Sequence, residues 1–147
     1  GRVYVGTGEG QVLVFACESG FPVQRWINNT DDSSAVTCLS ASTASGLLVV
    51  GTQEGAVHIY TLGQLRSAGA VNIARLLFEG EPAAQGAALR HVRLFRVASS
   101  PRLPITLLTV DVASRMRLWG LDIHGKSGKL DELQLLVDGG QLREVDC

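Results

Sequence analysis

Several residue types that mark particular protein classes are scarce in this sequence or poorly spaced. The three cysteines, Cys17, Cys38 and Cys147, form no Cys-x-x-Cys pair and share no metal-binding spacing with a histidine. Neither a zinc site nor a disulfide framework is therefore indicated, and an odd number of reduced thiols favours an intracellular protein, cytoplasmic or nuclear. No apolar run reaches the roughly eighteen residues that a membrane-spanning helix requires, so we expect no membrane span.

Charged and aromatic side chains are also sparse. Only 18% of the residues are charged and the formal net charge is −1, which argues against a dedicated nucleic-acid binder. The aromatic fraction is 5%, too low to predict a surface on which successive bases stack. Apolar residues make up 46%, which argues against a disordered chain and indicates a folded domain of ordinary size.

Catalytic and cofactor-binding motifs are missing as well. The glycines at 6–10 resemble a phosphate-binding loop, but they lie between two predicted strands and no helix follows them. No Gly-x-Ser-x-Gly nucleophile motif occurs, and His58, His91 and His124 share no spacing with an acidic or cysteine cluster. His91 instead occupies the strand position that Cys38 holds one unit earlier, which predicts a packed side chain. We therefore expect no enzyme centre, no metal and no cofactor.

What the sequence does contain is a repeat. The segment GTQEGAVHIY at 51–60 copies GTGEGQVLVF at 6–15, and a weaker third copy, VDVASRMRLW, lies at 110–119. The first two read as the end of one strand, a tight turn and a second strand, because the glycine of an acidic-Gly pair accepts the positive φ that such turns require. Self-similarity at this spacing predicts a repeat architecture.

Short strands fill the rest of each unit. LLVVGT at 47–52 and PITLLTVD at 104–111 are apolar almost throughout, as expected where both faces of a small sheet are covered. Two segments are ambiguous. VNIARLLFEG at 71–80 has helical apolar spacing, but the repeat favours an outer strand there, after a loop at 63–69; residues 130–139 read as an outer strand or a short helix.

A second spacing supports the same units. The first strand of each unit has an apolar pair three residues apart: Val36 and Leu39, Leu89 and Val92, Leu142 and Val145. We expect an all-β fold of β-propeller blades, each of four antiparallel strands, in a single propeller over 1–147. The predicted units are 1–34 (partial), 35–87, 88–140 and 141–147 (the start of the next). Because propellers close with about four to eight blades, we expect an excerpt of a larger propeller.

At these positions the chain resembles the WD-repeat β-propeller family. The family pattern is a small residue at a strand end, Ser or Thr, an acidic-Gly turn, then Val-x-hydrophobic-Trp-Asp. The matching positions are Thr7, Glu9, Gly10, Val12 and Phe15; Thr52, Glu54, Gly55, Val57, Ile59 and Tyr60; Met116, Leu118 and Trp119. The departures are Gly120 after Trp119, Asp111 where the other units have threonine, Ala113-Ser114 in place of Asp-Gly, and no Gly-His pair in any unit.

The resemblance implies a binding function. Family members usually act as non-catalytic protein–protein interaction scaffolds within multiprotein complexes, so it implies other protein subunits as partners. The alternative is a propeller enzyme whose catalytic groups lie outside this segment.

One charge asymmetry offers a candidate contact surface. Six of the thirteen basic residues lie between 88 and 117, where the single acid is Asp111: Arg90, Arg93, Arg96, Arg102, Arg115 and Arg117. Arginine suits bidentate contacts, which predicts an acidic or phosphate-bearing partner. The same residues fit solvated strand ends whose stems cover apolar surface. Nucleic-acid binding is a third interpretation, which the shortage of nearby aromatics does not favour.

Overall fold

The computed structural model describes residues 1–16, 23–28, 34–63, 67–72, 88–96, 104–123 and 130–141. None of these residues is helical, which confirms the predicted all-β class. They form the strands β1 (Arg2–Gly6), β2 (Gln11–Ala16), β3 (Val23–Asn28), β4 (Val36–Ser42), β5 (Leu47–Thr52), β6 (Ala56–Thr61), β7 (Ser67–Asn72), β8 (Leu89–Arg96), β9 (Ile105–Asp111), β10 (Arg115–Ile123) and β11 (Leu130–Gln141).

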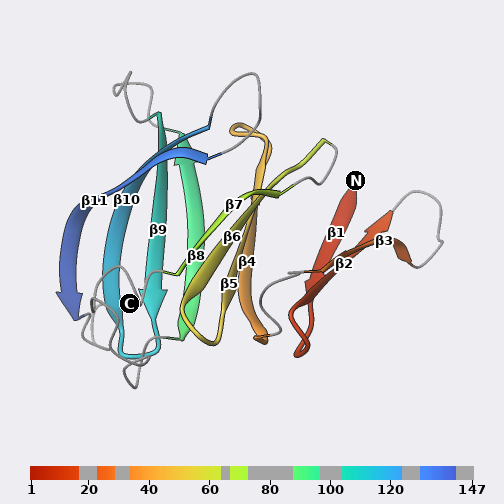
Figure 1. The fold of residues 1–147 in the computed structure, drawn as a ribbon, viewed down its shortest axis with the longest axis horizontal. Coiled ribbons are helices and arrows are strands. Elements are labelled where there is room, and N and C mark those ends of the chain that lie inside the picture. Colours follow the sequence, from red (N-terminus) through yellow and green to blue (C-terminus); the bar gives the residue numbers. More distant parts are fainter. Residues whose placement is uncertain are drawn as a thin grey trace.

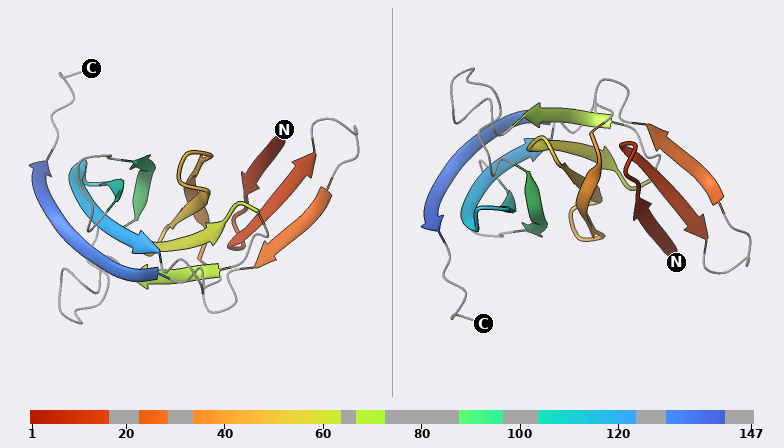
Figure 2. Two further views of the ribbon diagram at one scale, coloured as in Figure 1. Left: turned by 90° about the horizontal axis from the view of Figure 1, so that it is seen from above. Right: turned by 90° about the horizontal axis from the view of Figure 1, so that it is seen from below.

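The strands make three antiparallel sheets. The first sheet has the order β1-β2-β3, the middle sheet β4-β5-β6-β7 and the third sheet β8-β9-β10-β11. The two four-stranded sheets confirm the predicted blade, and Figure 1 shows all three side by side. In Figure 2 the sheets follow an arc, with β1, β4 and β8 on its inner side and β3, β7 and β11 on its outer side. The β1–β2, β5–β6 and β9–β10 turns lie at one end of the sheets, which we call the turn end (Figure 1).

Both faces of the middle sheet are covered, which explains its unbroken apolar strand. Successive side chains of a strand point to opposite faces. Leu48 and Val50 of β5 pack against β2 in a core between the first and middle sheets, the first joint. Leu47 and Val49 point the other way, into a core between the middle and third sheets, the second joint. The predicted stacking of neighbouring blades on β5 is therefore confirmed.

The second joint is the larger of the two cores. Burying one Leu or Val completely stabilises a fold by about 1.5–3 kcal/mol, so sheets too small to have cores of their own are held by stacking. The buried residues of the second joint are Leu47, Val49, Val57, Ile59, Ala68, Leu89, Val92, Leu94, Ile105, Leu107, Trp119 and Leu121.

A β-bulge explains the apolar pairs that are three residues apart. Val36 of β4 lies opposite Thr52 of β5, and Cys38 lies opposite Gly51, so β4 advances by two residues where β5 advances by one. The extra residue puts Val36 and Leu39 on one face, and both pack against the first joint. The same shift occurs at the start of β8, where the apolar pair packs into the second joint.

The outer strands differ most from the prediction. The outer strand of the middle sheet is β7, at Ser67–Asn72, so it begins within the segment expected to be a loop; residues 73–80 lie outside the described residues. β11 is a strand, which decides between the two alternatives for 130–139. The predicted start of another unit falls on 142–147, outside the described residues, and Gln141 itself ends β11.

Candidate binding surface

The three hairpin turns at the turn end share one hydrogen-bonding pattern. Thr7 Oγ1 accepts a hydrogen bond from the Gln11 amide at 3.1 Å, and Thr52 Oγ1 accepts one from the Ala56 amide at 3.1 Å. In the third sheet Asp111 Oδ1 accepts from the amide four residues later at 3.0 Å. Asp111 therefore takes the place of the two threonines, as its position in the repeat indicates.

The last residue of each turn adopts a left-handed backbone. The φ angles are 78° at Gly10, 83° at Gly55 and 62° at Ser114. Glycine adopts this region freely, whereas a residue with a Cβ does so at a cost. The third turn thus keeps the geometry of the other two with a less suitable residue.

Asp111 also pairs with a buried arginine. Its Oδ2 lies 3.3 Å from the Nη1 of Arg117, and each side chain is only 8% exposed. Arg117 lies six residues after Asp111, where the first two sheets have Leu13 and His58. A buried pair of this kind is costly to break, because the remaining charge is left in an apolar environment. Arg117 is therefore part of the packed sheet.

A second buried polar contact lies deeper in the third sheet. Trp119 Nε1 donates a hydrogen bond to Thr109 Oγ1 at 3.0 Å, and both residues are buried. Thr109 faces Arg117 across the β9–β10 pair, so the two contacts occupy adjacent positions. The sequence analysis singled out Trp119 but not Thr109. Thr109 could have been noticed as a residue with a hydroxyl group in the strand that precedes Trp119.

Three members of the arginine group are exposed on the third sheet. Arg90 and Arg115 lie near the starts of β8 and β10, which places both at the turn end. Arg93 lies further along β8, with its guanidinium carbon 5.7 Å from the centroid of the Phe95 ring. The side chain of Arg96 and the whole of Arg102 are outside the described residues.

His91 is exposed, and the prediction of a packed side chain there is wrong. It corresponds to Cys38, which is partly buried against the second joint. The register shift at the start of β8 matches that in β4, so the two side chains point in equivalent directions. Nothing in the described part of the chain stacks on that side of the third sheet, and His91 therefore stays accessible.

The turn end has opposite charges on different sheets. Glu9 and Glu54 are exposed in the turns of the first and middle sheets, whereas Arg115 is exposed beside the turn of the third. Asp111 is buried with Arg117, so its charge does little to offset the exposed arginines. Three arginines of the third sheet are therefore exposed, Arg90, Arg93 and Arg115, and we call these three residues the basic surface. Arg93 points away from the second joint, because its neighbours Val92 and Leu94 point into it.

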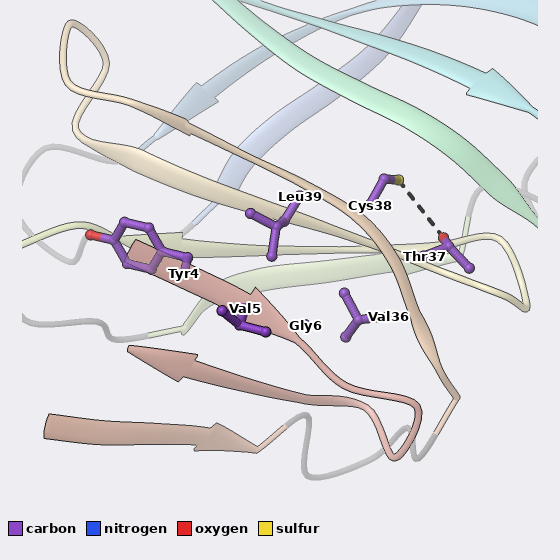
Figure 3. A pocket seen from close by; sticks show the side chains of 7 residues that line it. All are labelled: Tyr4, Val5, Gly6, Val36, Thr37, Cys38 and Leu39. Carbon is purple, nitrogen blue, oxygen red and sulfur yellow. Dashed lines mark hydrogen bonds between the residues drawn. The ribbon is translucent and has the colours of Figure 1, made fainter. Parts of the chain in front are cut away.

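A hollow of about 290 Å³ opens between the inner strands of the first and middle sheets. Figure 3 shows its lining: Tyr4, Val5, Gly6, Val36, Thr37, Cys38 and Leu39. The Cys38 thiol is free and accepts a hydrogen bond from Thr37 Oγ1 at 3.8 Å. Burial raises the pKa of this thiol, and hydrogen bonds with Thr37 and the Gly51 backbone oppose the rise. The thiol is therefore a poor nucleophile near neutral pH.

Other kinds of site have little support in the described part of the chain. There, no group of three or more His, Cys, Asp or Glu side chains is placed to hold a metal ion. Nor does any helix in those residues have the length and apolarity needed to cross a membrane.

Comparison with solved structures identifies the fold. The Chaetomium thermophilum Sqt1 structure, bound to the N-terminus of the ribosomal protein L10, matches with a TM-score of 0.64 and 13% identity, over 90% of this chain and 31% of that one. The WD40 repeats of RRP9 match with a TM-score of 0.59 and 14% identity, over 90% of this chain and 34% of that one. The chain has the WD40 β-propeller fold. The β-propeller domain of Myceliophteria thermophila Cps50 (Swd1) matches with a TM-score of 0.60 and 12% identity, over 99% of this chain and 37% of that one.

The WD40 resemblance read from the turns and from Trp119 is therefore confirmed at the level of fold. This chain spans about a third of the length of these propellers. No family model matches the chain, and no curated protein matches it.

Proposed function

We propose that this WD40-fold segment is a non-catalytic scaffold that binds other proteins within a multiprotein complex. Two of the similar structures come from an assembly or a bound state: one is the mitotic checkpoint complex, and the other is Sqt1 with a ribosomal protein N-terminus. A rigid stack of sheets suits this role, because buried joints fix the positions of side chains on exposed strand ends. The free Cys38 thiol agrees with an intracellular compartment, cytoplasmic or nuclear.

The observation that favours a particular partner is the basic surface. Arg90, Arg93 and Arg115 are exposed on one sheet, and the acid of that region is buried with Arg117. Guanidinium groups make bidentate hydrogen bonds to carboxylates and phosphates. The proposed partner is therefore a protein segment with acidic or phosphorylated side chains. Arg96 and Arg102 belong to the same proposal on sequence grounds alone.

The test measures binding of acidic, phosphorylated and neutral peptides of equal length by fluorescence anisotropy. The wild-type chain is compared with a variant in which Arg90, Arg93 and Arg115 are all alanine. We expect at least tenfold weaker binding of the acidic or phosphorylated peptides, about 1.4 kcal/mol, with an unchanged thermal midpoint. Arg2→Ala is the control, because Arg2 is an exposed arginine on β1 of the first sheet. This change also removes the hydrogen bond that Arg2 Nη1 donates to the Leu62 carbonyl at 3.2 Å, so its thermal midpoint is measured as well.

Two results would contradict the proposal. Equal affinities of wild type and the triple variant for these peptides would show that the basic surface does not bind them. Tighter binding of a single-stranded RNA than of any peptide, with affinity falling steeply as salt rises, would instead favour a nucleic-acid partner.

A further inference from the structure

The three turns at the turn end differ in the charges that they expose. Glu9 lies in the β1–β2 turn and Glu54 lies at the same position of the β5–β6 turn, and both side chains are exposed. The third turn has Ala113 at that position, and the residue that follows this turn is the exposed Arg115. Figure 1 shows the three turns one after another along the turn end, so the order of exposed charge along them is negative, negative, positive.

A second position of the repeat strengthens this change of sign. Thr37 is the extra residue at the register shift in β4, and Arg90 is its counterpart in β8. Each is the second residue of its strand, and both side chains are exposed at the turn end. The third sheet therefore has two exposed arginines there, Arg90 and Arg115, where the middle sheet has Thr37 and Ala56, which are uncharged.

The glutamate of the middle sheet and the arginine of the third do not neutralise each other. Within the described ranges, Glu54 and Arg115 form no salt bridge with each other, although the second joint holds their sheets side by side. Hydrogen bonds fix the backbone at both positions: the Glu54 amide donates to Ser34 Oγ at 3.1 Å, and the Arg115 amide donates to Asp111 Oδ1 at 3.0 Å. Two opposite charges are thus presented separately on a fixed frame.

Arg115 lies on the side of the third sheet that faces the middle sheet. Residues two apart in a strand share a face, so Arg115 is on the same face of β10 as Trp119. Trp119 packs into the second joint. Arg115 is therefore exposed at the end of a joint that two described sheets already fill.

The stacking of the sheets sets the spacing of these charges. Stacked sheets lie about 10 Å apart, and an extended chain advances about 3.3 Å per residue. A segment that lies across the turns therefore advances by roughly three residues from one sheet to the next. Residues of that segment at intervals of roughly three would contact Glu9, Glu54 and Arg115 in turn.

We propose that the turn end binds an extended segment of a partner protein with the charge order basic, basic, acidic, at intervals of roughly three residues. The basic residues contact Glu9 and Glu54, and the acidic or phosphorylated residue contacts Arg90 and Arg115. Val112, which is 51% exposed in the third turn, offers an apolar contact beside the acidic residue. This proposal rests on the proposed scaffold function and specifies the partner of its basic surface. The glutamates add selectivity, because like charges placed opposite each other oppose binding.

The probes are three capped peptides of equal length, with serine at every position marked x, measured on the full chain by fluorescence anisotropy at low salt. The first is Lys-x-x-Lys-x-x-Glu. The second, Lys-x-x-Glu-x-x-Lys, has the same composition and the wrong order in either chain direction; the third is Lys-x-x-Glu-x-x-Glu. We expect the first to bind wild type about fivefold or more tightly than the second, because several weak surface contacts change sign together.

A charge reversal on the protein tests the assignment of one position. Glu54→Lys should invert the preference, so that Lys-x-x-Glu-x-x-Glu binds more tightly than Lys-x-x-Lys-x-x-Glu. Asp122→Lys makes the same change of net charge at the opposite end of β10, and it should keep the preference of wild type. Thermal midpoints are measured for both variants, and an inverted preference is a readout that partial unfolding would not produce.

The outcomes separate this inference from the scaffold proposal. Equal binding of the first two peptides, or an unchanged preference in Glu54→Lys, overturns the charge order; if the acidic peptides still bind through the arginines, the proposed function stands. Failure of every peptide to bind, the acidic ones included, overturns both proposals. A dimer of the chain that Glu54→Lys dissociates overturns the assignment to a partner protein, because the arginines of a second copy then pair with the glutamates.

Discussion

Substituting Asp111 by threonine separates two roles that this carboxylate combines. One oxygen accepts the Arg115 amide at 3.0 Å, a contact that Thr52 makes equally well in the middle sheet at 3.1 Å. The other oxygen balances the buried Arg117 at 3.3 Å. Asp111→Thr should therefore keep the turn and lose the charge partner.

The expected cost follows from the burial of the pair. Removing one member of a buried ion pair costs about 3–5 kcal/mol, because the other charge is left uncompensated. In a domain of this size, 1 kcal/mol shifts the melting midpoint by about 2–4 °C, so Asp111→Thr should lower it by about 6–20 °C. Asp111→Ala should cost about 1 kcal/mol more, because the hydrogen bond from Arg115 is lost as well.

The compensating variant is Arg117→Leu, which installs the residue found at the same place in the first sheet, Leu13. Replacing a whole buried pair by well-packed apolar or neutral groups is often neutral or stabilising. The double variant Asp111→Thr/Arg117→Leu should therefore be more stable than Asp111→Thr alone by at least about 2 kcal/mol. Urea denaturation of wild type, both single variants and the double variant gives the coupling free energy. Additive effects would refute the idea that the two side chains act as a pair.

Three further perturbations test separate features. Gly6→Ala should destabilise the fold by about 1–3 kcal/mol, because the alanine Cβ would lie 2.7 Å from the Val36 Cβ. Gly8→Ala is the control, because open space surrounds Gly8, and it should change the free energy of unfolding in urea by less than about 0.5 kcal/mol. Equal effects of the two changes would show that β1 and β4 are not tightly packed at Gly6. Ser114→Gly should raise the melting midpoint, because φ is 62° there; a lower midpoint would mean that the serine is not strained. Because burial raises the pKa of the Cys38 thiol, Cys38 should react with iodoacetamide at pH 8 more slowly than glutathione does, as measured in a variant whose other two cysteines are serine. The thiol's contribution to the stability of the fold is present below the ordinary thiol pKa of about 8.5, and it is lost as pH rises through the raised pKa of the folded state. Reaction as fast as glutathione would show that the thiol is accessible.

The hairpins could be predicted from sequence because their signals are local. Turn chemistry at Glu9-Gly10 and Glu54-Gly55 fixes each β-turn within a few residues, and the apolar run at 47–52 indicates a strand covered on both faces. The third turn was predicted from the weaker repeat copy at 110–119, although Ser114 there adopts the left-handed backbone that glycine adopts in the other two turns.

The outer strand of the middle sheet could not be placed from its sequence. β7 is SAGAVN, with small residues and no strong alternation, because a rim strand buries little apolar surface. The repeat favoured an outer strand at 71–80 although the apolar spacing of that segment is helical, whereas the strand begins at Ser67.

The sequence could predict that arginines are frequent between residues 88 and 117, but not which of them are exposed. Which arginines are exposed depends on hairpin register: Arg117 faces Thr109 inside the sheet, whereas Arg115 lies at the strand end. His91 shows a second limit. Its strand position is that of Cys38, but its exposure depends on whether another sheet stacks there.

The stacking of neighbouring sheets can be tested most directly by a disulfide across the second joint. A Cβ on Gly51 would lie 3.2 Å from the Leu89 Cβ, a few tenths of an ångström short of the usual disulfide range of about 3.5–4.5 Å. With the native cysteines replaced by alanine, Gly51→Cys/Leu89→Cys should oxidise to an intramolecular disulfide, seen as two lost thiols by mass spectrometry. The control pair Gly51→Cys/Leu94→Cys, five residues further along β8, should stay reduced. Two free thiols in the first pair after oxidation, or equal oxidation of both pairs, would contradict the face-to-face packing of the middle and third sheets.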